Sequence, residues 1–261
     1  MRASLPPRGE LPPQGIIDIW VVPLSSSAEE SVELDSVLSS DERRRATHFR
    51  FIRDAARFRE RRAALRIGLS RYLDQPASEL VLTTGVFGKP RLAGESPLRF
   101  NLAHSQDLAV MAFTTVGEVG IDLEAVTGTE IPVESIATAY FTPEEAALVR
   151  QRRPINAQAR TFFRLWARKE AVLKAAGCGL SSPLDSIDVA SGNIASVRTG
   201  LDAGIDSRWR VEDLELGLDF IGAVAGPAHD WLIRQWPRSN QMVWKENLWG
   251  KNPITTEEQP C

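Results

Sequence analysis

Two carboxylates separated by one apolar residue are the first candidates for chemistry in this chain: Asp122 and Glu124, within the stretch Gly-Ile-Asp-Leu-Glu at 120–124. In a strand, residues i and i+2 lie on the same face. Ile121 and Leu123 would then point into a core, while the two acids point out together with Cα atoms about 7 Å apart. Like charges this close repel unless a cation lies between them, and Mg²⁺ takes such oxygen ligands beside substrate phosphates. The alternative is a solvated strand end that carries two acids.

A second charged pair lies about 50 residues further on, where Glu170 and Lys174 occupy positions i and i+4 of a predicted helix. This spacing places both side chains on one flank of the helix. An ordinary surface ion pair, worth about 0.2–0.5 kcal/mol, is one interpretation. The functional interpretation is that Glu170 supplies a third carboxylate to the cation, while Lys174 neutralises a phosphate beside it.

The composition is that of a globular protein, with 43% hydrophobic and 25% charged residues among 261. The net charge of −3 argues against a nucleic-acid-binding protein but permits local basic patches. The two cysteines, Cys178 and Cys261, form no Cys-x-x-Cys motif, and the three histidines lie far apart. No apolar run reaches the length of a membrane span. We therefore expect a cytoplasmic protein that binds neither membranes nor nucleic acid.

The order of predicted elements repeats between the two halves of the chain. Each half has a short helix, one long helix and antiparallel strands, with the long helices at about 54–73 and 156–176. A turn at Gly117 is expected to lead from the strand at 108–114 into the Asp122 strand. The sequence thus predicts the α+β class: two similar subdomains related by a pseudo-twofold axis. Each is a long helix packed on a small antiparallel sheet, with the active site at their interface.

The predicted boundaries follow changes in composition. Residues 1–14 are rich in proline and are expected to form a disordered arm. The N-terminal α+β subdomain would span 15–117 and the C-terminal one 118–237, while 238–261 form a polar tail.

Several motifs, taken together, resemble the surfactin-synthetase type of 4'-phosphopantetheinyl transferase, in the superfamily of holo-acyl and peptidyl carrier protein synthases. The region that resembles the family covers roughly residues 40–190. Its specificity rests on joint order and spacing, because each motif alone is weak. The motifs are Gly88-Lys89-Pro90, Phe100-Asn101-Leu-Ala-His104-Ser105, Gly-Ile-Asp-Leu-Glu at 120–124, Phe141-Thr-Pro-Glu-Glu, Trp166-Ala-Arg-Lys-Glu170-Ala-Val-Leu-Lys174 and Pro-Leu-Asp-Ser at 183–186.

The resemblance implies transfer of phosphopantetheine from coenzyme A to a serine of an apo carrier protein, releasing adenosine 3',5'-bisphosphate. It implies that Asp122, Glu124 and Glu170 hold Mg²⁺, that Glu170 is also the candidate general base, and that Lys174 contacts the pyrophosphate during catalysis. It further implies that coenzyme A is bound by Arg45, Lys89, His104 and Lys174. Arg57 and Lys169 are weaker candidates. Ala103 departs from the family pattern, because many members carry a serine before the histidine.

Other functions remain open from the residues alone. A nuclease with three carboxylates would need a basic groove and a second metal ion. A catalytically silent module that binds coenzyme A or a carrier protein would not need the repulsive acids. As partners we expect coenzyme A and an apo acyl, polyketide or peptidyl carrier protein, which serves fatty-acid, polyketide or nonribosomal peptide synthesis. We expect a monomer, because two fused halves can build the cleft within one chain.

Overall fold

Two sheets and two long helices form the body of the protein in a computed structural model, which describes residues 5–24, 28–85, 87–126, 131–178, 183–190, 192–197 and 208–236. The predicted tail at 238–261 lies outside the described residues. The helices are α1 (Ala28–Glu33), α2 (Ser40–Ala46), α3 (Ile52–Leu73), α4 (Val133–Tyr140), α5 (Pro143–Gln151) and α6 (Ile155–Ala176). The strands are β1 (Ile16–Pro23), β2 (Leu82–Thr84), β3 (Pro90–Leu92), β4 (Arg99–Ser105), β5 (Leu108–Thr114), β6 (Gly120–Ala125), β7 (Ile187–Asp188), β8 (Ile194–Val197), β9 (Arg208–Leu214), β10 (Phe220–Pro227) and β11 (Leu232–Trp236).

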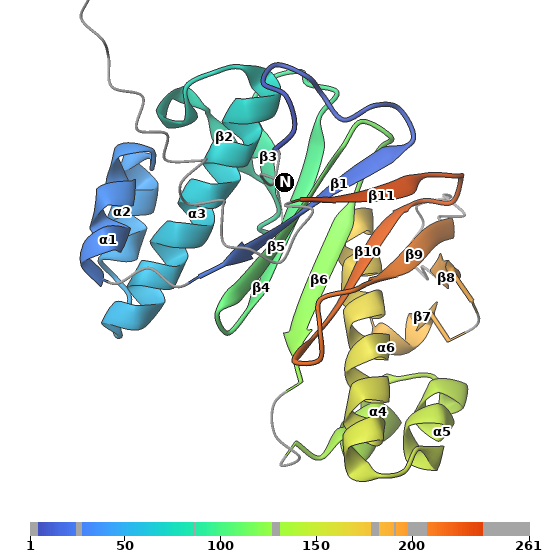
Figure 1. Ribbon diagram of the computed structural model, residues 1–261. Helices are drawn as coiled ribbons and strands as arrows, with labels where there is room; N and C mark the ends of the chain where they lie inside the picture. Colours follow the sequence, from blue (N-terminus) through green and yellow to red (C-terminus); the bar gives the residue numbers. More distant parts are fainter. Residues whose placement is uncertain are drawn as a thin grey trace, which may run out of the picture.

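The first sheet has the strand order β11-β1-β5-β4 and the second has the order β6-β10-β9-β8-β7. Helix α3 packs on the outer face of the first sheet through residues such as Leu65 and Leu69, which cluster with Trp20 and Phe113. Helix α6 packs on the outer face of the second sheet. The inner faces meet in a third cluster that includes Ile121. The layers are therefore helix, sheet, sheet and helix (Figure 1).

This architecture confirms the predicted α+β class with one long helix on each sheet. The pseudo-twofold relation between the halves stays a prediction. Strand β11 pairs in parallel with β1, so the first sheet is not purely antiparallel. The same pairing places the last described strand in the sheet of the predicted N-terminal subdomain, across the predicted division at residue 117. That division also stays a prediction.

The predicted turn at Gly117 does not join two paired strands, because β5 and β6 belong to different sheets. Strand β6 instead runs beside β4, and side chains bridge the two strands. The Ile121 amide donates to Asn101 Oδ1 at 3.0 Å, and the Ala125 amide donates to Ser105 Oγ at 3.0 Å. Two residues of the predicted Phe-Asn-Leu-Ala-His-Ser motif thus hold the edges of the two sheets together.

The prediction of a disordered arm is wrong for residues 5–14, which pack against the hydrophobic cluster between α3 and the first sheet. Leu5 and Leu11 contact that core. The Gly9 amide donates to the carbonyl of Arg71 at 2.8 Å, and the Arg71 side chain donates to the carbonyl of Pro6. Prolines here do not mark disorder, because their stiff backbone lets a short segment follow a surface at low entropic cost.

Candidate active site

Strand β6 presents its two acids to α6, as the alternation predicts. Ile121 and Leu123 are buried in the core between the sheets. Asp122 is only 5% exposed and Glu124 is half-buried, so the alternative of a solvated strand end is excluded. A buried carboxylate needs a partner, because desolvation strongly disfavours its charged form.

A glycine allows α6 to lie directly on β6. A Cβ added at Gly120 would meet the Ala171 carbonyl oxygen at 2.0 Å and the Ala175 amide nitrogen at 2.4 Å. Both are backbone atoms, so any side chain at residue 120 would push the helix away. Ala171 lies between Glu170 and Lys174 in sequence. The close contact therefore brings both charged side chains of α6 to the strand that carries Asp122.

The acids influence one another and share one cation. The Lys174 ammonium donates to Asp122 Oδ1 at 2.6 Å, while Asp122 Oδ2 and Glu170 Oε1 are buried without a hydrogen-bond partner. Desolvation, followed by the charge of Asp122, raises the pKa of Glu170. Desolvation and the Asp122 charge also raise the pKa of Glu124 to about 7, with a smaller contribution from Glu170. One lysine thus balances only part of the negative charge that three carboxylates would carry.

The three carboxylates form a donor set that suits a hard divalent cation, because all its atoms are oxygens and two of them are orphaned. Among the residues that the structure describes, however, no three His, Cys, Asp or Glu side chains already stand in a metal-holding arrangement. Lys174 bonds to Asp122. Binding a metal ion requires this contact to be exchanged for the ion, so the three-carboxylate site stays a prediction.

A polar cavity of about 420 Å³ brings two further predicted residues together. Arg45 and His104 both line it, between α2, α3, the β2–β3 pair and β4. Partial desolvation and then the charges of Arg61 and Lys174 lower the pKa of His104 to about 4. The imidazole is therefore neutral near pH 7, and the positive charge at this cavity comes from arginines.

Lys89 lies near the carboxylates and the polar cavity, but its ammonium points toward the interior of the protein. It donates to Glu118 Oε2 at 2.8 Å, to the carbonyl of Val119 at 3.0 Å and to the carbonyl of Lys174 at 2.9 Å. An ammonium has three donors, so all of them are in use. The prediction that Lys89 binds coenzyme A stays a prediction, and it requires the ammonium to release one acceptor. As placed, Lys89 ties the end of α6 to the start of β6.

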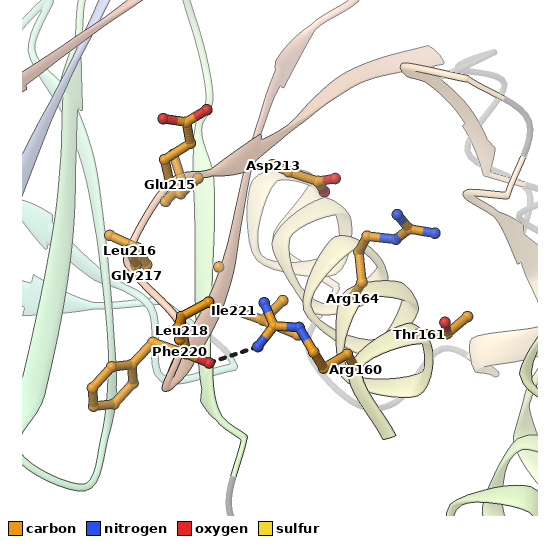
Figure 2. Close-up of a pocket in the computed structure, with 12 residues that line it drawn as sticks. Arg160, Thr161, Arg164, Asp213, Glu215, Leu216, Gly217, Leu218, Phe220 and Ile221 are labelled. Carbon is orange, nitrogen blue, oxygen red and sulfur yellow. Dashed lines mark hydrogen bonds between the residues drawn. The ribbon is translucent and has the colours of Figure 1, made fainter. Parts of the chain in front are cut away.

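Another hollow, of about 490 Å³, lies between α6 and the β9–β10 turn and contains none of the predicted site residues (Figure 2). The Arg160 side chain reaches from α6 to this turn and donates to the carbonyl of Leu218 at 2.6 Å. The Phe220 ring lies on the other side of the hairpin. This hollow is separate from the carboxylates and from the polar cavity.

Two basic residues near the site have roles that the sequence did not predict. Lys169, a weak candidate, is fully buried and donates to Glu145 Oε2 at 2.6 Å and to the carbonyl of Leu184 at 2.8 Å, so it serves the fold of the second half. Arg61 was missed, although its guanidinium contacts His104. Its position four residues after Arg57, on the same helical face, is the signal that could have identified it.

The chain is similar to a family model and to several known proteins. A family model described as the 4'-phosphopantetheinyl transferase superfamily matches residues 118–228. The 4'-phosphopantetheinyl transferase HetI of Nostoc sp. (strain PCC 7120) is 38% identical over 177 residues, which cover 67% of this chain and 73% of HetI. The chain belongs to the 4'-phosphopantetheinyl transferase superfamily.

Other members of the superfamily are similar over comparable lengths. The 4'-phosphopantetheinyl transferase psf-1 of Bacillus pumilus is 32% identical, covering 66% of this chain and 72% of psf-1. Sfp of Bacillus subtilis (strain 168) is 30% identical, covering 62% of this chain and 70% of Sfp. The predicted resemblance is thereby confirmed, and this superfamily member is a transferase. No helix among the described residues is long and apolar enough to cross a membrane.

Proposed function

We propose that this protein transfers the 4'-phosphopantetheine group from coenzyme A to a serine of an apo acyl, polyketide or peptidyl carrier protein, with Mg²⁺. The observation that carries the proposal is the meeting of Asp122, Glu124, Glu170 and Lys174 where α6 crosses β6. Two of these carboxylates keep a buried oxygen without a partner. Such a charge imbalance is costly in a fold and is useful for holding a metal–diphosphate complex.

The chemistry follows from the roles of these side chains. The carrier serine attacks the phosphorus on the pantetheine side of the diphosphate, and the bond to the adenosine bisphosphate leaving group breaks. Glu170 accepts the serine proton as the general base. Lys174 neutralises the charge that develops on the leaving phosphate. Asp122, Glu124 and Glu170 would hold Mg²⁺, which would supply positive charge to the diphosphate oxygens.

The coenzyme is proposed to extend from the carboxylates toward the polar cavity. Lys174 marks the carboxylate end, and its charge also reaches His104. Arg45 and His104 line the cavity itself. A ligand with a diphosphate at one end and a further phosphate at the other matches this sequence of charges, whereas nucleic acid would need a longer basic groove.

The test uses the purified protein with coenzyme A, Mg²⁺ and apo carrier proteins of the fatty-acid, polyketide and peptide types. Intact-mass spectrometry of each carrier should show the addition of one phosphopantetheine group. A reaction with added chelator is the control and should give no product. Absence of any mass gain, on all three carrier types, would overturn the proposal.

A further inference from the structure

Strands β4 and β6 lie at the edges of two different sheets, and each pairs with another strand on its far side. Two side chains of β4 accept hydrogen bonds from the facing edge of β6. Asn101 Oδ1 accepts from the Ile121 amide and Ser105 Oγ accepts from the Ala125 amide, both at 3.0 Å. We call these two hydrogen bonds the β4–β6 bridges. Each joins residues 20 apart in sequence, so the two strands run in the same direction at a constant register.

The β4–β6 bridges enclose the residues of the candidate site. They are four residues apart on each strand, which is about 13 Å at the usual strand rise. Asp122 and Glu124 lie between them on β6, and His104 lies between them on β4. Two fixed points set both the position and the tilt of a short segment. The bridges therefore set the separation between the two acids and the strand that carries His104 to the polar cavity.

Apolar packing between the sheets does not fix this separation by itself. The inner cluster contains Ala103 of β4 together with Ile121 and Leu123 of β6. Such packing is not directional, so it holds two surfaces together without specifying their register. A hydrogen bond weakens steeply outside narrow limits of distance and angle. Because Ile121 is fully buried, a shift of β6 would leave its amide without an acceptor, and this opposes the shift.

The two parts of the candidate site also have supports that do not involve the bridges. On one side, α6 packs directly on Gly120, and Lys174 binds Asp122. On the other side, Arg45 and His104 line the cavity between α2, α3 and β4. Loss of a bridge should therefore leave each part intact and change only how the two parts are placed relative to each other.

We propose that Asn101 and Ser105 are positioning residues for the transfer reaction, which hold the carboxylates of β6 and the cavity beside His104 at the separation that a bound coenzyme spans. Neither side chain has to contact the coenzyme. A ligand that reaches both parts depends on their separation, whereas a ligand that occupies one part does not. This inference rests on the proposed function.

Two measurements on the full-length variants test this role. The first is the rate of transfer to an apo carrier at saturating coenzyme A and Mg²⁺. Ser105→Ala should lower kcat by about ten-fold and Asn101→Ala by about ten- to a hundred-fold, because a displacement of about 1 Å can cost this much. The second is calorimetric titration with adenosine 3',5'-bisphosphate without Mg²⁺, which requires the cavity alone. Its affinity should stay within about twofold of the wild type.

Matched variants separate positioning from general stability. Ser105→Thr keeps the hydroxyl and should keep a rate close to that of the wild type. Thr114→Val is the control, because buried Thr114 also binds backbone, donating to the Ile16 carbonyl at 2.7 Å, but within the first sheet. This variant should lose stability and keep its rate. Thermal unfolding of each variant shows that the assays are made on folded protein, and half-buried Ser105 gives the milder change if Asn101→Ala does not fold.

Hydrogen exchange at single amides tests the bridges independently of activity. The Ala125 amide should exchange several-fold faster in Ser105→Ala than in the wild type. Faster exchange together with an unchanged kcat would overturn the inference and leave the proposed function standing. So would a Ser105→Thr variant as slow as Ser105→Ala, or a loss confined to the affinity for adenosine 3',5'-bisphosphate. A wild type that transfers to no carrier is the separate signature that overturns the proposed function, and the inference with it.

Discussion

The two long helices, α3 and α6, have the same length of 22 residues and cover opposite faces of the molecule, but they contact their sheets differently (Figure 1). In α3 the close contact is with a side chain: a Cβ added at Gly68 would meet the Phe113 ring at 2.8 Å. In α6 the contact is with the strand itself, because Gly120 of β6 faces helix backbone at 2.0 Å. Helix α3 therefore packs against an aromatic side chain, whereas the backbone of α6 packs directly against the backbone of β6.

This difference in packing corresponds to a difference in how the charged side chains of the two helices are held in place. The arginines of α3 are long and are held by separate partners such as Glu42 and the Phe58 ring. Glu170 and Lys174 of α6 are placed by the backbone contact at Gly120, which fixes them against Asp122. Charges that meet a reacting centre need the stiffer support, because small displacements there cost much activity.

The largest effect is expected at the carboxylate end. Glu170→Gln removes a proposed metal ligand and the proposed base, so transfer to an apo carrier should fall by at least about 100-fold. Coenzyme binding should be retained within an order of magnitude, since Glu170 does not line the polar cavity that contains Arg45 and His104. Rates come from a carrier mass-shift assay and binding from calorimetry. Glu144→Gln, an exposed acid on α5, is the control. A Glu170→Gln variant with full activity would contradict the assignment.

The contrast between the helices predicts unequal responses to a single methyl group. Gly120→Ala should prevent folding or cost roughly 3 kcal/mol or more in the free energy of unfolding, because two backbone atoms must move. Gly68→Ala should cost about 1–3 kcal/mol, since the Phe113 ring can shift. Urea denaturation measures both. Gly85→Ala, where the nearest contact is 3.5 Å, is the control. Equal losses at Gly120 and Gly68 would remove the distinction drawn here.

A smaller effect is expected from loss of the hydrogen bonds by which Lys89 joins the start of β6 to α6. Lys89→Met deletes three hydrogen bonds, to Glu118 and to the carbonyls of Val119 and Lys174, and should lower the free energy of unfolding by about 1–3 kcal/mol. Arg91→Gln removes a more exposed and longer contact with the same Glu118 and should change it by less than about 0.5 kcal/mol. If Lys89→Met weakens coenzyme binding without loss of stability, Lys89 contacts the coenzyme and does not mainly stabilise the fold.

The smallest expected effect is the pH dependence of protein stability in the absence of a divalent ion. Glu124 has a pKa of about 7 in the folded protein, above its ordinary value of 4.5, so the folded form binds its proton more tightly. Stability should therefore fall as the pH rises from about 5 to 7, and the loss is complete above 7. Mg²⁺ should offset this repulsion, so it should raise the melting temperature more at pH 8 than at pH 5.5. Differential scanning fluorimetry measures the shift, and an equal shift at both pH values would contradict the prediction.

The sequence predicted the regular parts of the fold well. Strand alternation placed Ile121 and Leu123 in a core, where both are buried. Periodicity located the long helices at 54–73 and 156–176, within two residues of their starts. These features depend on neighbours in sequence, so the order of residues is enough to find them.

The parts that were missed depend on contacts between distant residues. Pairing of β11 with β1, and the packing of residues 5–14, involve partners that no local pattern names. Within the candidate site, motif positions identified the charged residues but not their partners. Arg61 and Arg45 differ from Arg62 and Arg66 only in where the tertiary fold puts Glu42. Which arginine stays available for a ligand is therefore a property of the assembled structure.

Strand β11 has a consequence for how the chain is made. Strand β1 is synthesised well before its neighbour β11, and Arg234, whose side chain binds Asp18 at 2.6 Å, is made 216 residues after Asp18. Asp18 is completely buried, so its charge stays unbalanced until that arginine arrives. Completion of the first sheet must therefore wait until synthesis of the second is finished.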